Sequence, residues 1–394
     1  MSRVIVAGVG MVPFRKPGQS DAYDVMAANA TRMALADAGI GYSDVQQAYA
    51  GYVHADSCAG QTALYHVGIT GIPIYNVNNN CSSGSSAFAL AAQAVAGGSV
   101  ECALAVGFEQ MDRGAIDLAF PHKTSPFARH HAALRDAHGL SDDEMKLPPA
   151  LSMFGCQVEA IEALGVTAET LAGIAVKSRN HAAKSPYAIF REPLTVADIL
   201  DTPPIFRTMR RLYACPPSCG AAAVIVCSES FARRHGLRSD VALVGQGISS
   251  DLSSGLAGGV MDIMLQSLSE QAARQAYESA GVGPEEIDVI ELHDCFTSNE
   301  ASTYVALGLC KTEDINQFVA DGQNTYGGKY VICPSGGLLA KGHPLGATGL
   351  AQITELTWQL RGQAGERQVD DVRTVLQHNV GLGSAGFVHI FQRL

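Results

Sequence analysis

A single cysteine stands where a polar run gives way to a helix-forming run. Cys81 follows three asparagines, Asn78 to Asn80, and precedes the alanine-rich stretch 85–96. A thiol at the first turn of a helix lies near unpaired backbone N–H groups, which favour the thiolate over the thiol. The common alternative is a buried, inert cysteine. The three asparagines favour a turn that aims the sulfur into a cleft, so we expect a nucleophile.

Three further segments place reactive side chains where strands end. His293 and Cys295 directly follow the predicted strand 289–292. His343 stands among glycines at the start of a predicted helix, a position that favours contact with a ligand. The segment 377–383 adds glycine-rich backbone after another strand. In α/β proteins such strand ends converge on one site, so we expect these groups to meet.

Zinc binding is the competing interpretation of the cysteines and histidines. Structural zinc sites use closely paired ligands such as Cys-x-x-Cys. No such pair lies near His293, and Cys215 and Cys219 have no second pair. The ten cysteines also lack the spacing of a disulfide framework. We therefore expect no metal.

Composition limits the class of protein. The chain has 394 residues, of which 47% are apolar and 16% charged, and its net charge is −11 without any block of Lys or Arg. The apolar fraction is enough for a buried sheet, and the acidic balance argues against nucleic acid as a partner. No apolar run approaches the ~20 residues that span a bilayer. The start resembles a strand rather than a secretion signal, so we expect a cytoplasmic protein with no integral membrane contact.

The chain contains an internal repeat. Gly39 and Gly281, which are 242 positions apart, each end an alanine-rich predicted helix and precede a short turn and a buried strand. A second match relates residues 218–226 to residues 384–390. The repeat predicts two related α/β halves whose loops converge on a shared cleft.

The strand–helix rhythm is interrupted between the halves. Residues 120–206 are rich in proline and polar residues, with amphipathic helices expected at 151–164 and 167–182. We interpret this segment as an inserted loop domain that covers the substrate and the cleft. The expected domains are therefore an N-terminal half formed by 1–119 plus 207–234, the insertion 120–206, and a C-terminal half formed by 235–394.

Two thiols, two histidines and glycine-rich backbone together suit carbon–carbon chemistry on thioesters. A thiolate can attack a carbonyl and hold the acyl group covalently, while backbone N–H groups or histidines stabilise the oxyanion. The second thiol can exchange the α-proton of an acetyl thioester. A Ser–His–Asp hydrolase is not indicated, since the sequence has no Gly-x-Ser-x-Gly motif.

Four segments resemble the active-site loops of thiolases, and most closely those of the sterol-carrier-protein-type (lipid-transfer-protein) branch. They are Asn78-Asn79-Asn80-Cys81, His293-Asp294-Cys295-Phe296, Gly342-His343-Pro344-Leu345-Gly346-Ala347-Thr348-Gly349 and His378-Asn379-Val380-Gly381. The resemblance covers essentially the whole chain, without the sterol-carrier domain of that branch. It implies an α/β thiolase fold of five layers, α-β-α-β-α, with the inserted loop domain. It also implies a homodimer or homotetramer.

The resemblance further implies an acyl-CoA:acetyl-CoA C-acyltransferase. Such an enzyme acts on acyl-CoA substrates by ping-pong chemistry, with coenzyme A as co-substrate and no tightly bound cofactor. By analogy, Cys81 carries the acyl group and His343 activates it. His293 and His343 would stabilise the enolate oxygen. Cys295 would be the acid/base, because the last loop has no cysteine.

Other residues are expected to assist. The resemblance implies that the backbone N–H groups of Cys81 and Gly381 hold the oxyanion, and it places Asn379 in the same loop. Ser335 and Gly336, in a glycine-rich segment, are expected to contact coenzyme A.

Four alternatives remain open. Some thiolase homologues need a small zinc-ribbon/OB-fold partner subunit, and others have become aldolases. A third alternative is a non-catalytic acyl-CoA or lipid carrier on the same scaffold. A decarboxylating ketoacyl synthase is the fourth, and Cys295 argues against it because that chemistry usually needs no acid/base thiol.

Overall fold

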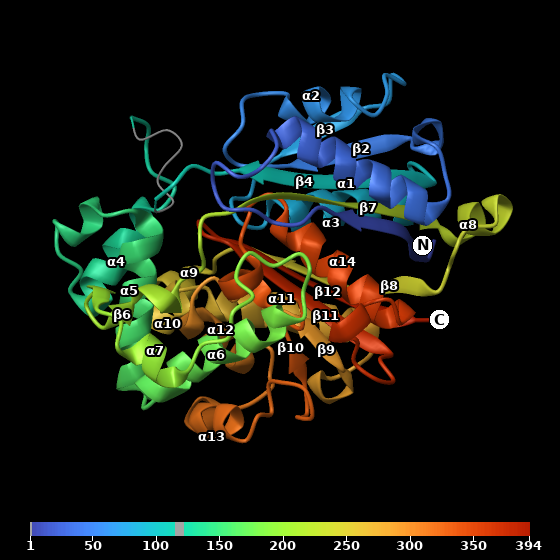
Figure 1. Cartoon of the computed structure of the whole chain (residues 1–394). Helices are drawn as coiled ribbons and strands as arrows, with labels where there is room; N and C mark the ends of the chain where they lie inside the picture. Colours follow the sequence, from blue (N-terminus) through green and yellow to red (C-terminus); the bar gives the residue numbers. More distant parts are fainter. Residues whose placement is uncertain (1, 115–121) are drawn as a thin grey trace.

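The computed structural model describes residues 2–114 and 122–394, which form a ten-stranded sheet with the order β10-β9-β11-β12-β8-β1-β7-β4-β2-β3 (Figure 1). Five adjacent strands belong to the N-terminal half: β1 (Val4–Met11), β2 (Gln47–Gly51), β3 (Ile74–Val77), β4 (Cys102–Gln110) and β7 (Cys219–Ser228). The other five belong to the C-terminal half: β8 (Val241–Ser249), β9 (Val289–Glu291), β10 (Val331–Ile332), β11 (Thr374–Gly381) and β12 (Ala385–Arg393). Strands β1 and β8 join the halves as an antiparallel pair.

Helices cover both halves in the same way. On the N-terminal half these are α1 (Tyr23–Ala38), α2 (Ala59–Tyr65), α3 (Ser83–Ala96) and α8 (Glu229–His235). The C-terminal half has α9 (Ser253–Leu256), α10 (Val260–Ile263), α11 (Gln266–Ala280), α12 (Thr297–Ala306), α13 (Ile315–Ala320) and α14 (Thr348–Arg361). Helix α1 packs on one outer face and α11 on the other, while α14 contacts α3 and strands of both halves (Figure 1). The result is the arrangement of two α/β halves that the sequence predicted.

The internal repeat is confirmed in three dimensions. Both α1 and α11 end at a left-handed glycine, Gly39 and Gly281. Each helix also packs on the first strand of its half through a glycine. A Cβ at Gly8 would lie 2.3 Å from the carbonyl oxygen of Ala34, and one at Gly245 would lie 2.4 Å from that of Ala276. These contacts let backbone meet backbone, so the two halves share one helix-to-strand spacing.

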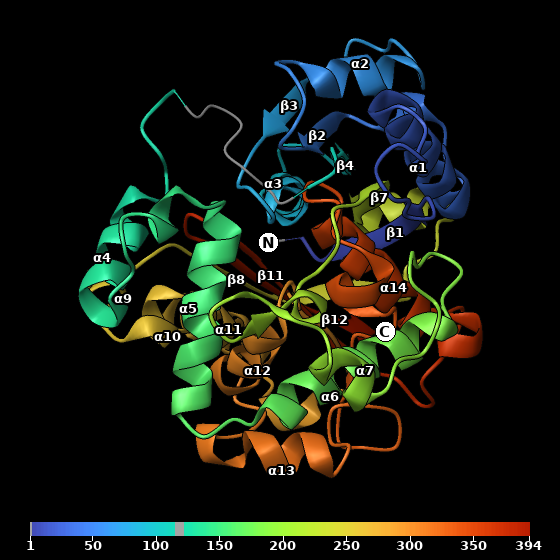
Figure 2. The ribbon, with the colours of Figure 1, turned by 60° about the vertical axis from the view of Figure 1, so that its left-hand side comes forward.

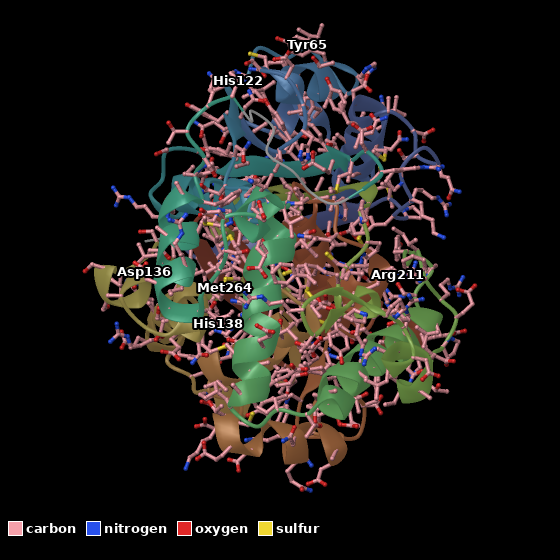
Figure 3. The ribbon with its side chains drawn as sticks, turned by 90° about the vertical axis from the view of Figure 1, so that its left-hand side faces the viewer. Tyr65, His122, Asp136, His138, Arg211 and Met264 are labelled. Atoms are coloured by element: carbon pink, nitrogen blue, oxygen red, sulfur yellow. The ribbon has the colours of Figure 1, made fainter. Side chains whose placement is uncertain are left out.

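The inserted segment is mainly helical. It contains α4 (Ala128–His138), α5 (Pro149–Ala163), α6 (Ala168–Ala183) and α7 (Val196–Leu200), followed by a small hairpin of β5 (Pro204–Phe206) and β6 (Met209–Arg210). The predicted helices at 151–164 and 167–182 correspond to α5 and α6, which confirms both. Nε2 of His138 at the end of α4 donates a 3.0 Å hydrogen bond to Glu159 Oε2 of α5, so these helices form one unit on the face seen in Figure 3.

Within the described part of the chain, no helix combines the length and apolar character needed to cross a membrane.

Candidate active site

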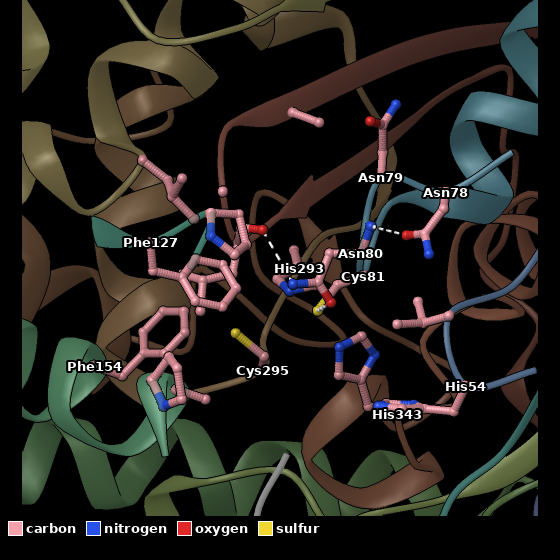
Figure 4. A pocket seen from close by; sticks show the side chains of 18 of the residues that line it. His54, Asn78, Asn79, Asn80, Cys81, Phe127, Phe154, His293, Cys295 and His343 are labelled. Carbon is pink, nitrogen blue, oxygen red and sulfur yellow. Dashed lines mark hydrogen bonds between the residues drawn. The ribbon is translucent and has the colours of Figure 1, made fainter. Parts of the chain in front are cut away.

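The predicted reactive side chains meet at one cavity of about 460 Å³ (Figure 4). Cys81, His293, Cys295 and His343 all line it. Much of the remaining wall is apolar and includes residues of the insertion: Pro126, Phe127, Pro149, Ala150 and Phe154, with Leu265, Phe296 and Leu382 from the C-terminal half. The insertion therefore contributes to the wall of the cavity, as the sequence analysis expected.

Each side chain reaches the cavity from a strand-to-helix connection. Cys81 lies between β3 and α3, after Asn80, which adopts a left-handed conformation (φ 52°) that asparagine tolerates. His293 and Cys295 lie between β9 and α12, and His343 precedes α14. The strands β3 and β10, which precede Cys81 and His343, occupy equivalent places at the two ends of the sheet order, and β9 is the neighbour of β10, so the pseudo-twofold brings these connections from both halves to one place.

Burial dominates the environment of the Cys81 thiol. It raises the pKa of Cys81 to about 12, although hydrogen bonds from the backbone N–H groups of Leu382 and of Cys81 itself act in the opposite direction. The thiol contacts Asn80 Oδ1 at 3.7 Å. Burial therefore outweighs the helix start, and the expectation that the helix start alone would favour a thiolate is wrong. A base must take the proton when the sulfur attacks.

His343 is placed as that base. The hydroxyl of Thr348 donates to the carbonyl oxygen of Pro344 at 3.0 Å, so it accepts from His343 Nδ1, which lies 2.7 Å away. This bond leaves Nε2 of His343 as an acceptor, and that buried atom has no hydrogen-bond partner among the described residues. Burial lowers the pKa of His343 to about 3, which keeps the ring neutral and the lone pair of Nε2 unprotonated.

His293 is fixed in the opposite tautomer. Asn379 Nδ2 donates to His293 Nδ1 at 2.8 Å, while Asn379 Oδ1 accepts from the Ser85 hydroxyl at 2.8 Å. The proton of His293 therefore sits on Nε2, where it can be donated to an oxyanion. Burial lowers the pKa of His293 well below its ordinary value. Its ring meets that of His343 edge to face, with centroids 5.0 Å apart.

The tautomers also bear on the zinc hypothesis. Cys81, His293 and His343 each offer one ligand atom, and these atoms lie within 4.8 Å of one another. A metal needs lone pairs from both rings. Since Asn379 holds the proton of His293 on Nε2, the arrangement favours one acceptor and one donor around a sulfur, which is acid–base chemistry.

Cys295 has a neighbour that the sequence analysis did not assign to the site. Cys215 also lines the cavity, and its backbone N–H donates to the carbonyl oxygen of Cys295 at 2.9 Å. Burial raises the pKa of both thiols well above the usual value. An isolated antiparallel bridge between Ala214 and Phe296 brings them together. No local sequence signal predicts a contact across such a separation.

His54 is another lining residue without a sequence prediction. Its backbone N–H donates to Glu109 Oε1 at 2.8 Å, and its side-chain Nδ1 lies 3.6 Å from the same atom. Hydrogen bonding to Glu109 raises the pKa of His54. Glu109 also accepts from the Gly346 N–H at 3.0 Å, close to His343 in the sequence. Glu109 thus links the N-terminal half to the loop that carries His343.

The assisting residues differ from expectation. Gly381 does not line the cavity; a Cβ there would lie 2.0 Å from the Asn79 carbonyl oxygen, so it allows close packing against the turn before Cys81. The following residue, Leu382, supplies an N–H to the sulfur instead. Asn379 is buried behind His293, which it orients.

The expected contact of Ser335 and Gly336 with coenzyme A is not supported. Ser335 is fully buried, and both its N–H and its hydroxyl donate to the Glu291 carboxylate, at 3.0 and 2.9 Å. Gly336 packs against Ala182 of α6. These residues stabilise the loop from within and lie outside the cavity wall.

Comparisons with known proteins show the family of the chain. The family model described as "Thiolase, N-terminal domain" matches residues 4–230, and "Thiolase C-terminal domain-like" matches residues 256–393. The chain is 48% identical to Sterol carrier protein 2 of Oryctolagus cuniculus, over 100% of this chain and 72% of that protein. It is 34% identical to benzoylsuccinyl-CoA thiolase subunit BbsB of Thauera aromatica, over 97% of this chain and 95% of that protein. The solved structure titled "Ltp2-ChsH2(DUF35) aldolase" matches with a TM-score of 0.82 and 24% identity, over 99% of this chain and 98% of that one.

Proposed function

The chain belongs to the thiolase family, in its sterol-carrier-protein-type branch, and we propose that it interconverts 3-oxoacyl-CoA plus coenzyme A with acetyl-CoA plus a shortened acyl-CoA. The observation that carries the proposal is the set of chemical groups around the sulfur of Cys81. Cys81 meets an acceptor histidine and a donor histidine, and a second thiol lines the same cavity. Acyl transfer of this kind needs each of these groups.

In the first half-reaction, Cys81 passes its proton to Nε2 of His343 as its sulfur attacks the 3-keto carbon. The Leu382 N–H, which already faces the sulfur, stabilises the resulting oxyanion. Cleavage of the bond between C2 and C3 leaves the acyl group on Cys81 and releases the acetyl-CoA enolate. The enolate oxygen accepts from Nε2 of His293 and from the newly protonated His343, and Cys295 gives its proton to the enolate carbon.

The second half-reaction restores every proton. The Cys295 thiolate takes the proton of the coenzyme A thiol, whose sulfur attacks the acyl-Cys81 carbonyl. Collapse of that intermediate releases the shortened acyl-CoA, and the departing Cys81 sulfur recovers its proton from His343. Burial raises the pKa of both thiols, so each is protonated at the start and at the end of a complete turnover.

The proposal is tested by intact-protein mass spectrometry. Incubation with a 3-oxoacyl-CoA and no added coenzyme A should add one shortened acyl group per chain and release an equal amount of acetyl-CoA. A wild-type protein that gains no mass, although it binds the substrate, would contradict the proposal. It would favour the non-catalytic carrier instead.

The same measurement addresses a partner subunit. The Thauera relative is by its name one subunit of its enzyme, and the aldolase structure is titled with a DUF35 protein. If the isolated chain forms the adduct, the first half-reaction requires no zinc-ribbon/OB-fold partner. If retro-aldol cleavage were the reaction, an aldehyde or ketone would be released and no acyl group would remain on Cys81.

We further propose that the chain forms a homodimer through β3, which lies at one edge of the sheet. Tyr75 on β3 is 47% exposed, Leu90 on α3 is 39% exposed and Tyr65 at the end of α2 is 52% exposed. Exposed edge strands with apolar neighbours are usually covered by another chain. Light scattering should give twice the chain mass, and Tyr75→Lys should shift the protein towards the monomer. An unchanged mass for that variant would exclude β3 as the interface.

A further inference from the structure

Three segments from different parts of the chain meet beside the loop that follows β11. His130 comes from α4 of the insertion, Asp251 from the connection between β8 and α9, and Ser384 from the turn between β11 and β12. Nε2 of His130 lies 2.8 Å from Asp251 Oδ2 and 2.9 Å from the Ser384 hydroxyl, which also donates to Asp251 Oδ2. Figure 2 shows α4 beside α9 at this side of the molecule. None of the three residues lines the cavity.

The hydrogen bonds assign the protons. The Asp251 carboxylate only accepts, so it takes the hydroxyl proton of Ser384 and the Nε2 proton of His130. Burial would raise the pKa of Asp251, but these hydrogen bonds hold it below the usual value. A hydrolytic triad needs serine and aspartate on opposite ring nitrogens. Here both groups meet Nε2, and the buried Nδ1 of His130 has no hydrogen-bond partner in the part of the chain that the structure describes. Ser384 is therefore not an activated nucleophile.

The cluster continues directly into the catalytic loop. Ser384 has φ of 86°, a left-handed conformation that serine rarely adopts and that its neighbours must hold in place. Two residues before Ser384, both backbone polar groups of Leu382 form interactions. Its N–H faces the Cys81 sulfur, and its carbonyl oxygen accepts from Asn80 Nδ2 at 3.1 Å. The loop thus joins the nucleophile at one end and the cluster at the other.

The inserted segment, which forms part of the cavity wall, is attached to the same cluster. Phe127, which lines the cavity, precedes His130 by less than one helical turn, and a Cβ at Gly383 would lie 3.2 Å from its ring. The insertion therefore contacts the loop twice, through an aromatic ring and through the imidazole of His130. Movement of α4 would displace both contacts together.

From these contacts we propose that His130, Asp251 and Ser384 form a clip that positions the Leu382 N–H against Cys81. The clip also couples the position of that N–H to the position of the inserted segment. The three residues act through Leu382 and are positioning residues, because none of them touches the reacting atoms. The inference rests on the proposed function, since it assigns the Leu382 N–H to the oxyanion. A donor displaced by about 1 Å can cost on the order of 10²-fold in rate, so a modest loosening of this loop should be measurable.

Ser384→Gly separates a positioning role from a merely structural one. Glycine prefers the left-handed conformation, so a residue that only formed the turn could be replaced without loss, and the variant should melt at the same temperature as the wild type or higher. If the clip positions Leu382, the rate of acyl-enzyme formation should fall by about 10-fold, with the substrate dissociation constant unchanged. An unchanged acylation rate would overturn the proposal.

Substitutions at the other two positions supply the controls. His130→Ala should resemble Ser384→Gly, whereas His130→Gln should recover most of the rate because its amide can donate to Asp251. The double variant His130→Ala with Ser384→Gly should be no slower than either single variant, since the three groups act as one unit. Ser253→Ala at the start of α9, outside the cluster, should keep the wild-type rate. Additive losses in the double variant would contradict the clip.

Hydrogen exchange distinguishes failure of the clip from failure of the proposed function. Without any substrate, the peptide spanning residues 380–385 should exchange faster in Ser384→Gly and His130→Ala than in the wild type. If the wild type forms no acyl-enzyme, the proposed thiolase activity fails. Equal exchange in all variants would overturn the clip itself.

Discussion

Replacing Cys81 with alanine will abolish the acyl-enzyme and reduce thiolysis by at least about 10⁴-fold, because no other group can carry the acyl chain at that point. The variant should still fold, since the smaller side chain removes only a sulfur from the cavity wall. The measurement is the intact mass after incubation with a 3-oxoacyl-CoA, together with the rate of acetyl-CoA release. Cys310→Ala is the matched control, because Cys310 lies outside the cavity and should keep both the adduct and the rate.

The pH dependence of alkylation offers an independent check on Cys81. Its pKa is raised to about 12 by burial, so the thiolate fraction increases with pH throughout the range in which the protein can be handled. Inactivation by iodoacetamide should therefore be slow at neutral pH and accelerate steadily as the pH rises. A rate that reached a plateau near pH 8 would show an exposed, ordinary thiol.

In the acylation experiment, an acyl adduct that persisted in Cys81→Ala would place the acyl group on another residue.

The repeat and the reactive loops could be predicted from the sequence because their signals are local. Gly39 and Gly281 end equivalent helices, and such caps depend on a few neighbouring residues. Cys81 and His343 stand at helix starts that the surrounding asparagines and glycines mark clearly. Since the strands β3 and β10 that precede them occupy equivalent places in the two halves, the convergence of their loops followed from the repeat.

What the sequence could not predict depends on contacts between distant segments. The raised pKa of Cys81 comes from burial by other parts of the chain, so the helix start alone gave the wrong charge state. Cys215 reaches Cys295 through one long-range bridge. Ser335 carries the glycine-rich signature of a ligand loop, yet its polar groups are used by Glu291. A glycine-rich segment indicates that another group packs closely against the backbone. It does not indicate whether that group belongs to a ligand or to the protein itself.

The second large effect concerns Cys295, whose loss should separate the two kinds of chemistry. Cys295→Ala should still form the adduct from an acyl-CoA, because His343 and the Leu382 N–H remain to serve Cys81. It should lose exchange of the acetyl-CoA α-proton by on the order of 10²- to 10⁴-fold, the usual contribution of a general acid/base. Exchange is measured by the uptake of deuterium from the solvent into acetyl-CoA, monitored by mass spectrometry. Retained exchange would remove Cys295 from the mechanism.

The variant Cys215→Ala tests whether the acid/base role belongs specifically to Cys295. It is a third thiol in the described wall of the cavity, and its backbone is hydrogen bonded to that of Cys295. Cys215→Ala should keep most of the exchange rate, because Cys295 lies between β9 and α12 on the same loop as His293, which holds the enolate oxygen in the proposed mechanism. If Cys215→Ala abolished exchange and Cys295→Ala did not, the acid/base would lie on the opposite side of the bridge. The pairing of these two variants therefore locates the proton donor on one of two adjacent backbone segments.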